Sequence, residues 1–218
     1  MISWCMMTSP RPVPTINQSL ASFRAAGFTD PVLIVEDKDR IGALQAWQRA
    51  AHLVMRKRRR NAFVGIMEDD ILWARNAANV LHQEIELMGN IALTAGYLSP
   101  FAFNKHVLEP RRETWRGWHV SRLGFKSAGA QCYIVPRRSL RKLLDETQFQ
   151  VFCREPPRAK HGADHIVSGM FYQMNRKCWF RIPCLVNHKM GTTNSSMGHA
   201  VKDCDDLAWQ EEARLGAS

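Results

Sequence analysis

The sequence lacks any long apolar run, and no stretch approaches the ~18 consecutive apolar residues that a membrane-spanning helix needs. It lacks a basic leader as well. The apolar N-terminus, residues 1–7, runs directly into proline and arginine, which favours a buried strand over a signal peptide. Internal repeats, low-complexity segments and linkers are also missing. These absences predict a single cytoplasmic domain over residues 1–218 with no membrane span.

Closely spaced cysteine pairs are absent too. The chain has six cysteines, and none forms a CxxC motif, which argues against a cysteine-based zinc site. Without an export signal, we expect reduced thiols that pack as small apolar side chains. Because 45% of the residues are apolar, the chain has enough material for a core, and disorder is excluded.

Positive charge is in excess. The formal net charge of +10 gives information about binding partners and none about the fold. It favours a polyanion, such as nucleic acid, an anionic membrane surface or a phosphorylated substrate. A basic protein with no specific anionic partner stays an open alternative.

Apolar runs and helix-period segments alternate along the chain, and this alternation predicts an α/β fold with a mostly parallel sheet flanked by helices. The strands are expected at residues 1–7, 32–35, 63–67, 91–98, 131–135 and 179–182. Helices are expected at residues 16–26, 41–55, 75–88, 139–146, 164–175 and 205–214. Residues 99–127 and 150–163 are predicted to be irregular.

Three consecutive acids, Glu68, Asp69 and Asp70, end the apolar run at 63–67. Ligands of open α/β sheets bind beyond the carboxyl ends of the strands. A hard divalent cation that takes carboxylate and diphosphate oxygens would relieve the repulsion among these acids. The alternative is that the acids are favoured by the dipole of the helix expected from Arg75.

Other polar positions admit two interpretations each. Glu36 and Asp37 end a second strand, where they can accept hydrogen bonds from a ribose or form a solvated turn. His188 is a candidate metal ligand or an ordinary histidine. Asp164 is a candidate general base or the cap of the helix that it starts.

Taken in order, these segments resemble the GT-A glycosyltransferases, in particular small bacterial and phage members, over roughly residues 2–199. The resemblance is carried by Ser9-Pro10-Arg11, Val35-Glu36-Asp37, Gly65 to Asp70 as a DXD-type motif, Gly129 to Val135, Ala163-Asp164-His165, and Leu185 to Gly191. It implies a Rossmann-like GT-A fold and a metal-dependent transfer from a nucleotide sugar, with UDP as the default carrier. It divides the chain into a nucleotide-sugar half (1–98), an acceptor half (99–199) and a tail (200–218).

The resemblance also implies roles for single residues. Thr8, Pro10, Arg11, Glu36 and Asp37 would cradle the nucleoside. Asp70 and His188 would bind Mn²⁺ or Mg²⁺, with Glu68 or Asp69 on the metal, the ribose or the sugar. Asp164 would be the base of an inverting reaction. Lys189 departs from the resemblance, because many relatives have an uncharged residue there, and it would instead reach the diphosphate. The Glu-Asp-Asp sequence departs from the usual motif and leaves open which acid touches the metal.

The excess of positive charge in residues 105–160 gives an indication of the acceptor. Residues 105–160 contain thirteen Lys or Arg and five acids, with Trp115, Trp118, His119 and Phe125 among them. Cations interleaved with aromatic side chains suit a nucleic-acid backbone and its bases. The predicted acceptor contacts are Arg116, Trp118, Gly129 and Gln131.

We therefore expect an acceptor hydroxyl on hydroxymethylated pyrimidines in DNA, flipped out to reach the sugar, in a bacterium or a phage-infected cell. The alternatives are a cell-envelope or lipopolysaccharide glycan as acceptor, and a non-catalytic nucleic-acid-binding module. The chain lacks the sequence signatures of common nucleic-acid-binding motifs, which weakens the last alternative.

Overall fold

An eight-stranded sheet forms the centre of the molecule. The computed structural model describes residues 1–10, 14–57, 60–102, 113–121, 131–155, 162–182 and 184–188. In chain order, the strands of the sheet are β1 (Ile2–Thr8), β2 (Val32–Glu36), β3 (Phe63–Glu68), β5 (Tyr97–Ser99), β6 (Thr114–Trp115), β7 (Trp118–Ser121), β8 (Cys132–Pro136) and β9 (Cys178–Arg181). They lie side by side in the order β2-β1-β3-β8-β5-β9-β7-β6.

The sheet is mostly parallel, as predicted. Strand β1 pairs in parallel with β2 and β3, and β5 pairs in parallel with β9. Strand β8 is antiparallel to both β3 and β5, and β7 is antiparallel to both β9 and β6. Only β8 and β7 therefore run against the other described strands of this sheet.

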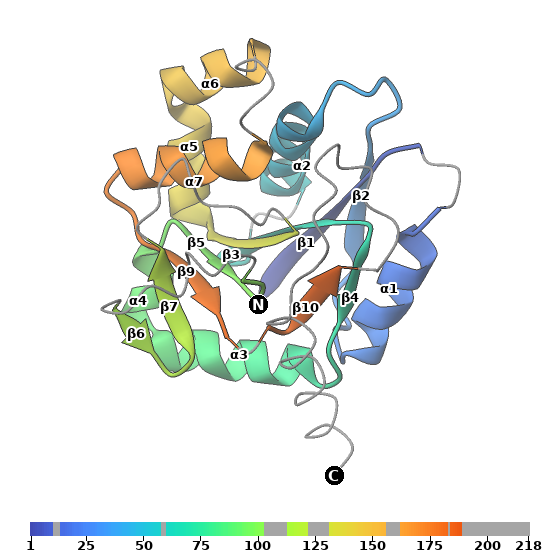
Figure 1. Ribbon diagram of the computed structural model, residues 1–218, viewed down its shortest axis with the longest axis vertical. Helices are drawn as coiled ribbons and strands as arrows, with labels where there is room; N and C mark the ends of the chain where they lie inside the picture. Colours follow the sequence, from blue (N-terminus) through green and yellow to red (C-terminus); the bar gives the residue numbers. More distant parts are fainter. Residues whose placement is uncertain are drawn as a thin grey trace.

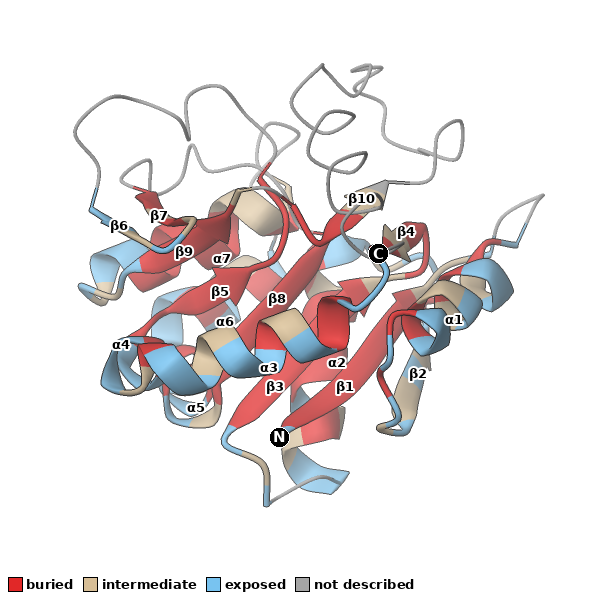
Figure 2. Ribbon diagram, turned by 90° about the horizontal axis from the view of Figure 1, so that it is seen from below, coloured by how far each residue is buried: buried red, intermediate tan, exposed pale blue. Residues whose placement is uncertain are grey.

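Helices cover both faces of the sheet (Figure 1). Helices α2 (Ala43–Lys57), α5 (Arg137–Asp145), α6 (Thr147–Arg154) and α7 (Ala163–Gln173) lie on one face, and α1 (Ile16–Ala25), α3 (Ala77–Met88) and α4 (Asn90–Thr94) lie on the other. Figure 2 shows the strands buried between helices whose outer surfaces are exposed. None of the described helices is both long enough and apolar enough to cross a membrane.

Aromatic side chains fill the core on each face. On the α1 side, the Trp4 ring meets Phe23, Phe28 and Trp73 in edge-to-face contacts. Gly65 on the neighbouring strand is required here, because a Cβ atom at this position would collide with the Trp4 ring. On the α2 side, Tyr133 meets Trp47 and Tyr97. The five described cysteines form no disulfide and are buried in this core, as expected for reduced thiols; Cys204 lies outside the described residues.

Several predicted elements differ from the structure. The continuous apolar run at 32–35 indicates a strand buried on both faces, but β2 forms an edge of the sheet, and Ile34 is 42% exposed. Residues 91–94 belong to helix α4 rather than to a strand. The expected loop at 150–163 contains the end of α6, and the irregular segment 99–127 contains the β6–β7 hairpin. The helix expected at 205–214 lies outside the described residues.

A second, smaller sheet joins two segments that are distant in sequence. Strand β4 (Ile71–Trp73) follows β3 after a two-residue turn, and it pairs antiparallel with β10 (Val186–His188). Neither strand was predicted. Because β4 starts directly after the acidic turn, this pairing brings the chain at residue 188 to the edge of the main sheet where β3 ends.

Candidate active site

The carboxyl ends of the first three strands meet at one edge of the sheet. Thr8 is in register with Glu36 on one side, and Met7 is in register with Glu68 on the other. The carbonyl oxygen of Gln131, just before β8, accepts a hydrogen bond of 2.9 Å from the Glu68 amide. The structure therefore brings residues from four segments to one edge, the usual place for a ligand in an α/β sheet.

Asp69 and Asp70 form the turn between β3 and β4, and both are buried, with 2% and 4% of their surfaces exposed. The Thr8 hydroxyl donates a hydrogen bond of 2.6 Å to Asp69 Oδ2. From α1, the Ser19 hydroxyl lies 2.6 Å from the Asp69 carbonyl oxygen and 2.7 Å from the Ile71 carbonyl oxygen. These bonds hold the acidic turn from both sides.

The alternative explanation of the three acids, a helix N-terminus, is wrong. The acids are followed by strand β4, and helix α3 begins only at Ala77 with Asn76 as its N-cap. The helix dipole acts over about the first turn, so it does not stabilise Asp69 or Asp70. The N-terminus of α3 therefore does not account for the burial of these two carboxylates.

The register of β10 places the main chain of His188 opposite Ile71, the residue after Asp70. The side chain of His188 and all of Arg11, Gly129 and Lys189 lie outside what the structure describes. Among the described residues, no three His, Cys, Asp or Glu side chains are grouped as a metal ion requires. The metal ligands therefore stay a prediction, to which the structure adds the proximity of two main-chain segments.

The two acids at the end of β2, Glu36 and Asp37, lie in different environments. Asp37 is buried, and its carboxylate accepts hydrogen bonds from the amides of Ile41 (2.9 Å) and Gly42 (3.3 Å). These bonds shape the loop that leads into α2, so the Asp37 carboxylate has a structural role here. The Glu36 side chain is 47% exposed and lies 3.4 Å from the Lys38 ammonium group. Pro10 is exposed in the loop after β1.

Asp164 lies in the first turn of α7. The N-cap position is occupied by Gly162, so the capping role considered for Asp164 is wrong. Asp164 Oδ1 lies 3.1 Å from His165 Nδ1, and both side chains are about one-fifth exposed, at 18% and 20%. The hydrogen bond to Asp164 raises the pKa of His165, and partial burial opposes this rise. The role of Asp164 as a general base stays a prediction.

The predicted acceptor contacts are separated. Arg116 and Gly117 form the turn of the β6–β7 hairpin, with φ angles of 42° and 85°. The Arg116 guanidinium lies 5.5 Å from the centre of the Trp115 ring. Trp118 is fully buried, and its indole N–H donates a hydrogen bond of 2.9 Å to Glu84 Oε2. Trp118 therefore stabilises the fold and has no surface to offer an acceptor.

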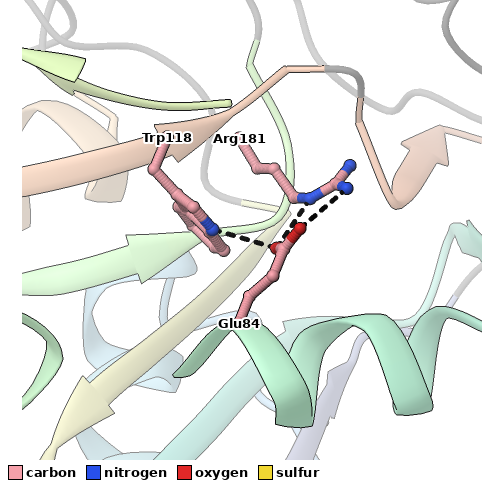
Figure 3. A network of polar contacts seen from close by, with 3 residues as sticks. All are labelled: Glu84, Trp118 and Arg181. Carbon is pink, nitrogen blue, oxygen red and sulfur yellow. Dashed lines mark hydrogen bonds and ion pairs between the residues drawn. The ribbon is translucent and has the colours of Figure 1, made fainter. Parts of the chain in front are cut away.

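Glu84 also holds Arg181, an ion pair that the sequence did not reveal. Arg181 Nε lies 2.9 Å from Glu84 Oε2, and Arg181 Nη2 lies 3.0 Å from Oε1. Figure 3 shows how the carboxylate from α3 receives both the guanidinium and the Trp118 indole. This network fixes α3 beneath β7 and β9.

Part of the positive charge lies at the opposite edge of the sheet. The Arg137 guanidinium donates to the carbonyl oxygens of Asn61 (2.8 Å) and Met55 (3.2 Å), before the start of β3. Burial and then the neighbouring charge of Arg141 lower the pKa of Arg137. These arginines, counted above as evidence of an acceptor groove, do not contribute to the edge that holds the acids.

Comparison with known proteins gives a limited result. No protein-family model matches the chain, and no curated protein sequence matches it. Two solved structures of the glycosyltransferase GlyE from Streptococcus pneumoniae TIGR4 are similar at 8% identity: one with a TM-score of 0.49 over 97% of this chain, the apo form with 0.45 over 96%. The chain spans 60% of the length of each. At these values, the likeness assigns neither a residue nor an activity to this chain.

Proposed function

We propose that the protein is a metal-dependent glycosyltransferase that moves a sugar from a nucleotide sugar to a hydroxyl group. The observation that supports this most is the buried turn Asp69-Asp70 at the carboxyl edge of the sheet. The main chain of His188 lies beside this turn, because His188 is in register with Ile71, and Asp164 lies in the first turn of α7.

The acidic turn fits a hard divalent cation. Two adjacent buried carboxylates repel each other, and α3 begins too far along the chain for its N-terminus to compensate them. Carboxylate oxygens are donors that suit Mn²⁺ or Mg²⁺, and the resemblance adds the imidazole of His188. Because Asp69 Oδ2 accepts the Thr8 hydroxyl, we favour Asp70 and His188 as the ligands. When bound, the metal supplies positive charge that stabilises the nucleoside diphosphate leaving group.

In this proposal, Asp164 accepts the proton of the attacking hydroxyl group. The acceptor oxygen forms the new bond to the anomeric carbon, while the bond from that carbon to the diphosphate breaks and its electron pair leaves with the nucleotide. Attack from the face opposite the leaving group inverts the anomeric centre. Lys189 neutralises charge on the diphosphate, an electrostatic contribution that removes several kcal/mol from such barriers.

For the acceptor, we propose hydroxymethylated pyrimidines in DNA. The proposal is supported by the net charge of +10 and by the exposed Arg116 at the hairpin turn. It is weaker than the sequence alone suggested, because Trp118 is buried and Arg137 faces the other edge. An envelope glycan is the second candidate, and transfer of labelled sugar to hydroxymethylated DNA but not to lipopolysaccharide separates the two.

The proposed activity is tested by release of UDP from UDP-glucose, UDP-galactose or UDP-N-acetylglucosamine, with and without MnCl₂. We expect release only with the metal, and we expect Asp70→Asn to abolish it. Asp145→Asn is the matched control, because Asp145 is an exposed acid at the end of α5. Thermal shift with each UDP-sugar measures binding separately, since a ligand at ~100 times its Kd adds about 2.7 kcal/mol of stability. If the wild-type protein neither binds nor turns over any nucleotide sugar, the proposal is wrong.

A further inference from the structure

The main sheet has two edge strands, and they differ in length and composition. Strand β6 forms one edge and has only two described residues. Strand β2 forms the other edge, has five residues, and is apolar at the first four of them (Figure 2). Edge strands are usually kept from pairing with another chain by short length, a lysine, a proline or a bulge. Strand β2 contains no lysine or proline, and its register with β1 is continuous.

The main-chain hydrogen bonds of β2 show which of its groups point out of the sheet. The Asp37 amide donates a hydrogen bond of 2.7 Å to the Thr8 carbonyl oxygen, so the main-chain groups of Asp37 point toward β1. Successive residues of a strand direct these groups to opposite sides. The residues of β2 whose amides and carbonyl groups point away from β1 are therefore Val32, Ile34 and Glu36. Among the described strands, none lies on that outer side.

The central side chain of this edge is apolar and exposed to solvent. Ile34 is 42% exposed, and the three other apolar side chains of β2 are half-buried. In the neighbouring strand β1, by contrast, every side chain from Ile2 to Met7 is buried. Ile34 is also the middle one of the three residues whose main-chain groups point outward. Exposed apolar surface combined with outward-pointing amides and carbonyl groups is what a further strand binds.

A second copy of β2 in antiparallel orientation matches this edge. If the two Ile34 residues lie opposite each other, Val32 of one copy lies opposite Glu36 of the other, so all three outward-pointing residues form hydrogen-bonded pairs. A shift by two residues in either direction places one of the three opposite a residue outside the strand. The same register places Asp30 opposite Lys38, two residues of opposite charge. The edge is therefore self-complementary, as a two-fold axis requires.

We propose that the protein forms a homodimer in which the β2 strands of two copies pair antiparallel about a two-fold axis at Ile34. The two sheets then form one continuous sheet. This inference goes beyond the proposed glycosyl transfer and does not depend on it. Because the paired strands are antiparallel, the carboxyl edges of the two sheets lie on opposite sides of the joint sheet. The acidic turn of one copy therefore does not face that of the other.

Light scattering coupled to size-exclusion chromatography tests the dimer. For the wild type, we expect twice the 25.0 kDa mass of one chain. Ile34→Lys and Ile34→Glu each place two like charges opposite each other at the axis, which destabilises a strand pair, so each variant alone should be a monomer. An equimolar mixture of the two should recover the dimer, because each lysine then lies opposite a glutamate. Leu87→Lys is the matched control and should stay dimeric, because Leu87 is an exposed apolar side chain on α3.

Ile34→Pro tests the main-chain pairing. Proline is tolerated on an edge strand where the amide points outward, so this variant should keep the wild-type circular dichroism spectrum and become a monomer. If the wild type has the mass of one chain at every concentration, the proposal is wrong. Slow hydrogen exchange of the Ile34 amide in such a monomer would show that another segment of the same chain covers the edge. A dimer that persists in Ile34→Lys and Ile34→Pro would place the interface elsewhere, and a mixture that stays monomeric would refute the two-fold register.

Discussion

The Thr8 hydroxyl donates a hydrogen bond of 2.6 Å to the Asp69 carboxylate, although the two residues are 61 positions apart in the sequence. Thr8 ends β1, and Asp69 follows the end of β3, the adjacent strand. The bond joins two loops at the edge where a ligand is expected. The hydroxyl that the resemblance assigned to the nucleoside thus orients one of the acids in this structure.

Thr8→Val tests this bond. The substitution keeps the shape of the side chain, removes the donor and leaves a buried carboxylate without it. We expect the free energy of unfolding to fall by about 1–3 kcal/mol, measured by urea denaturation. Thr8→Ser keeps the hydroxyl and should recover most of the loss. Equal stability of the valine variant and the wild type would contradict the assigned role.

Asp37 gives a second prediction, because its carboxylate accepts from two loop amides. Asp37→Ala removes both acceptors at the entrance to α2, and we expect a loss of about 0.5–2 kcal/mol, as for other capping acids. Asp39 is exposed in the same loop, so Asp39→Ala is the matched control and should change stability little. The midpoint of thermal unfolding distinguishes the two variants. If both lose the same amount, Asp37 has no special role in the loop.

Strand β3 and its acids were predictable because the signal is local. Residues 63–67 are continuously apolar, and the charge begins abruptly at Glu68. The strand at 32–35 was predicted from the same kind of signal, but its exposure was not, since an apolar run does not reveal whether a strand lies at an edge of the sheet. Helix α6 was not predicted, because it is separated from α5 only by Glu146 and has a short, mixed sequence.

The candidate site was less predictable, because it depends on contacts between distant segments. The pairing of Ile71 with His188 joins strands of only three residues, too short to leave a periodic pattern. Trp118 looked like a surface aromatic among cations, since the sequence does not show that Glu84 receives its indole. The sequence predicted which residue types form the candidate site, but the contacts that these residues make could be identified only from the structure.

Removal of either partner of the Glu84–Arg181 ion pair should strongly destabilise the protein. The Arg181 side chain is 8% exposed and the Glu84 side chain 16%, so solvent screens their interaction little. Removal of one partner, in Arg181→Met or Glu84→Leu, leaves a buried charge and should cost about 3–5 kcal/mol. The double variant removes both charges and should recover much of that loss. A double-mutant cycle by urea denaturation measures this coupling, and strictly additive losses would show that the two side chains do not interact.

His165 provides a pH-dependent prediction that requires no substrate. Its pKa is raised above the ordinary value of 6.5, first by the hydrogen bond to Asp164. A raised folded-state pKa adds stability that is complete below the unfolded pKa and is lost as the pH rises through the folded value. Wild-type stability should therefore decline above about pH 6.5 through this pair.

Asp164→Asn removes the carboxylate charge, so the pKa of His165 should fall and this decline should disappear. Nuclear magnetic resonance of the imidazole protons follows the pKa directly. His82 serves as an internal control, because burial is the first cause of its lowered pKa and Asp164 is not among the causes. A His165 pKa that is the same in both proteins would show that the pair at 3.1 Å carries no charge interaction.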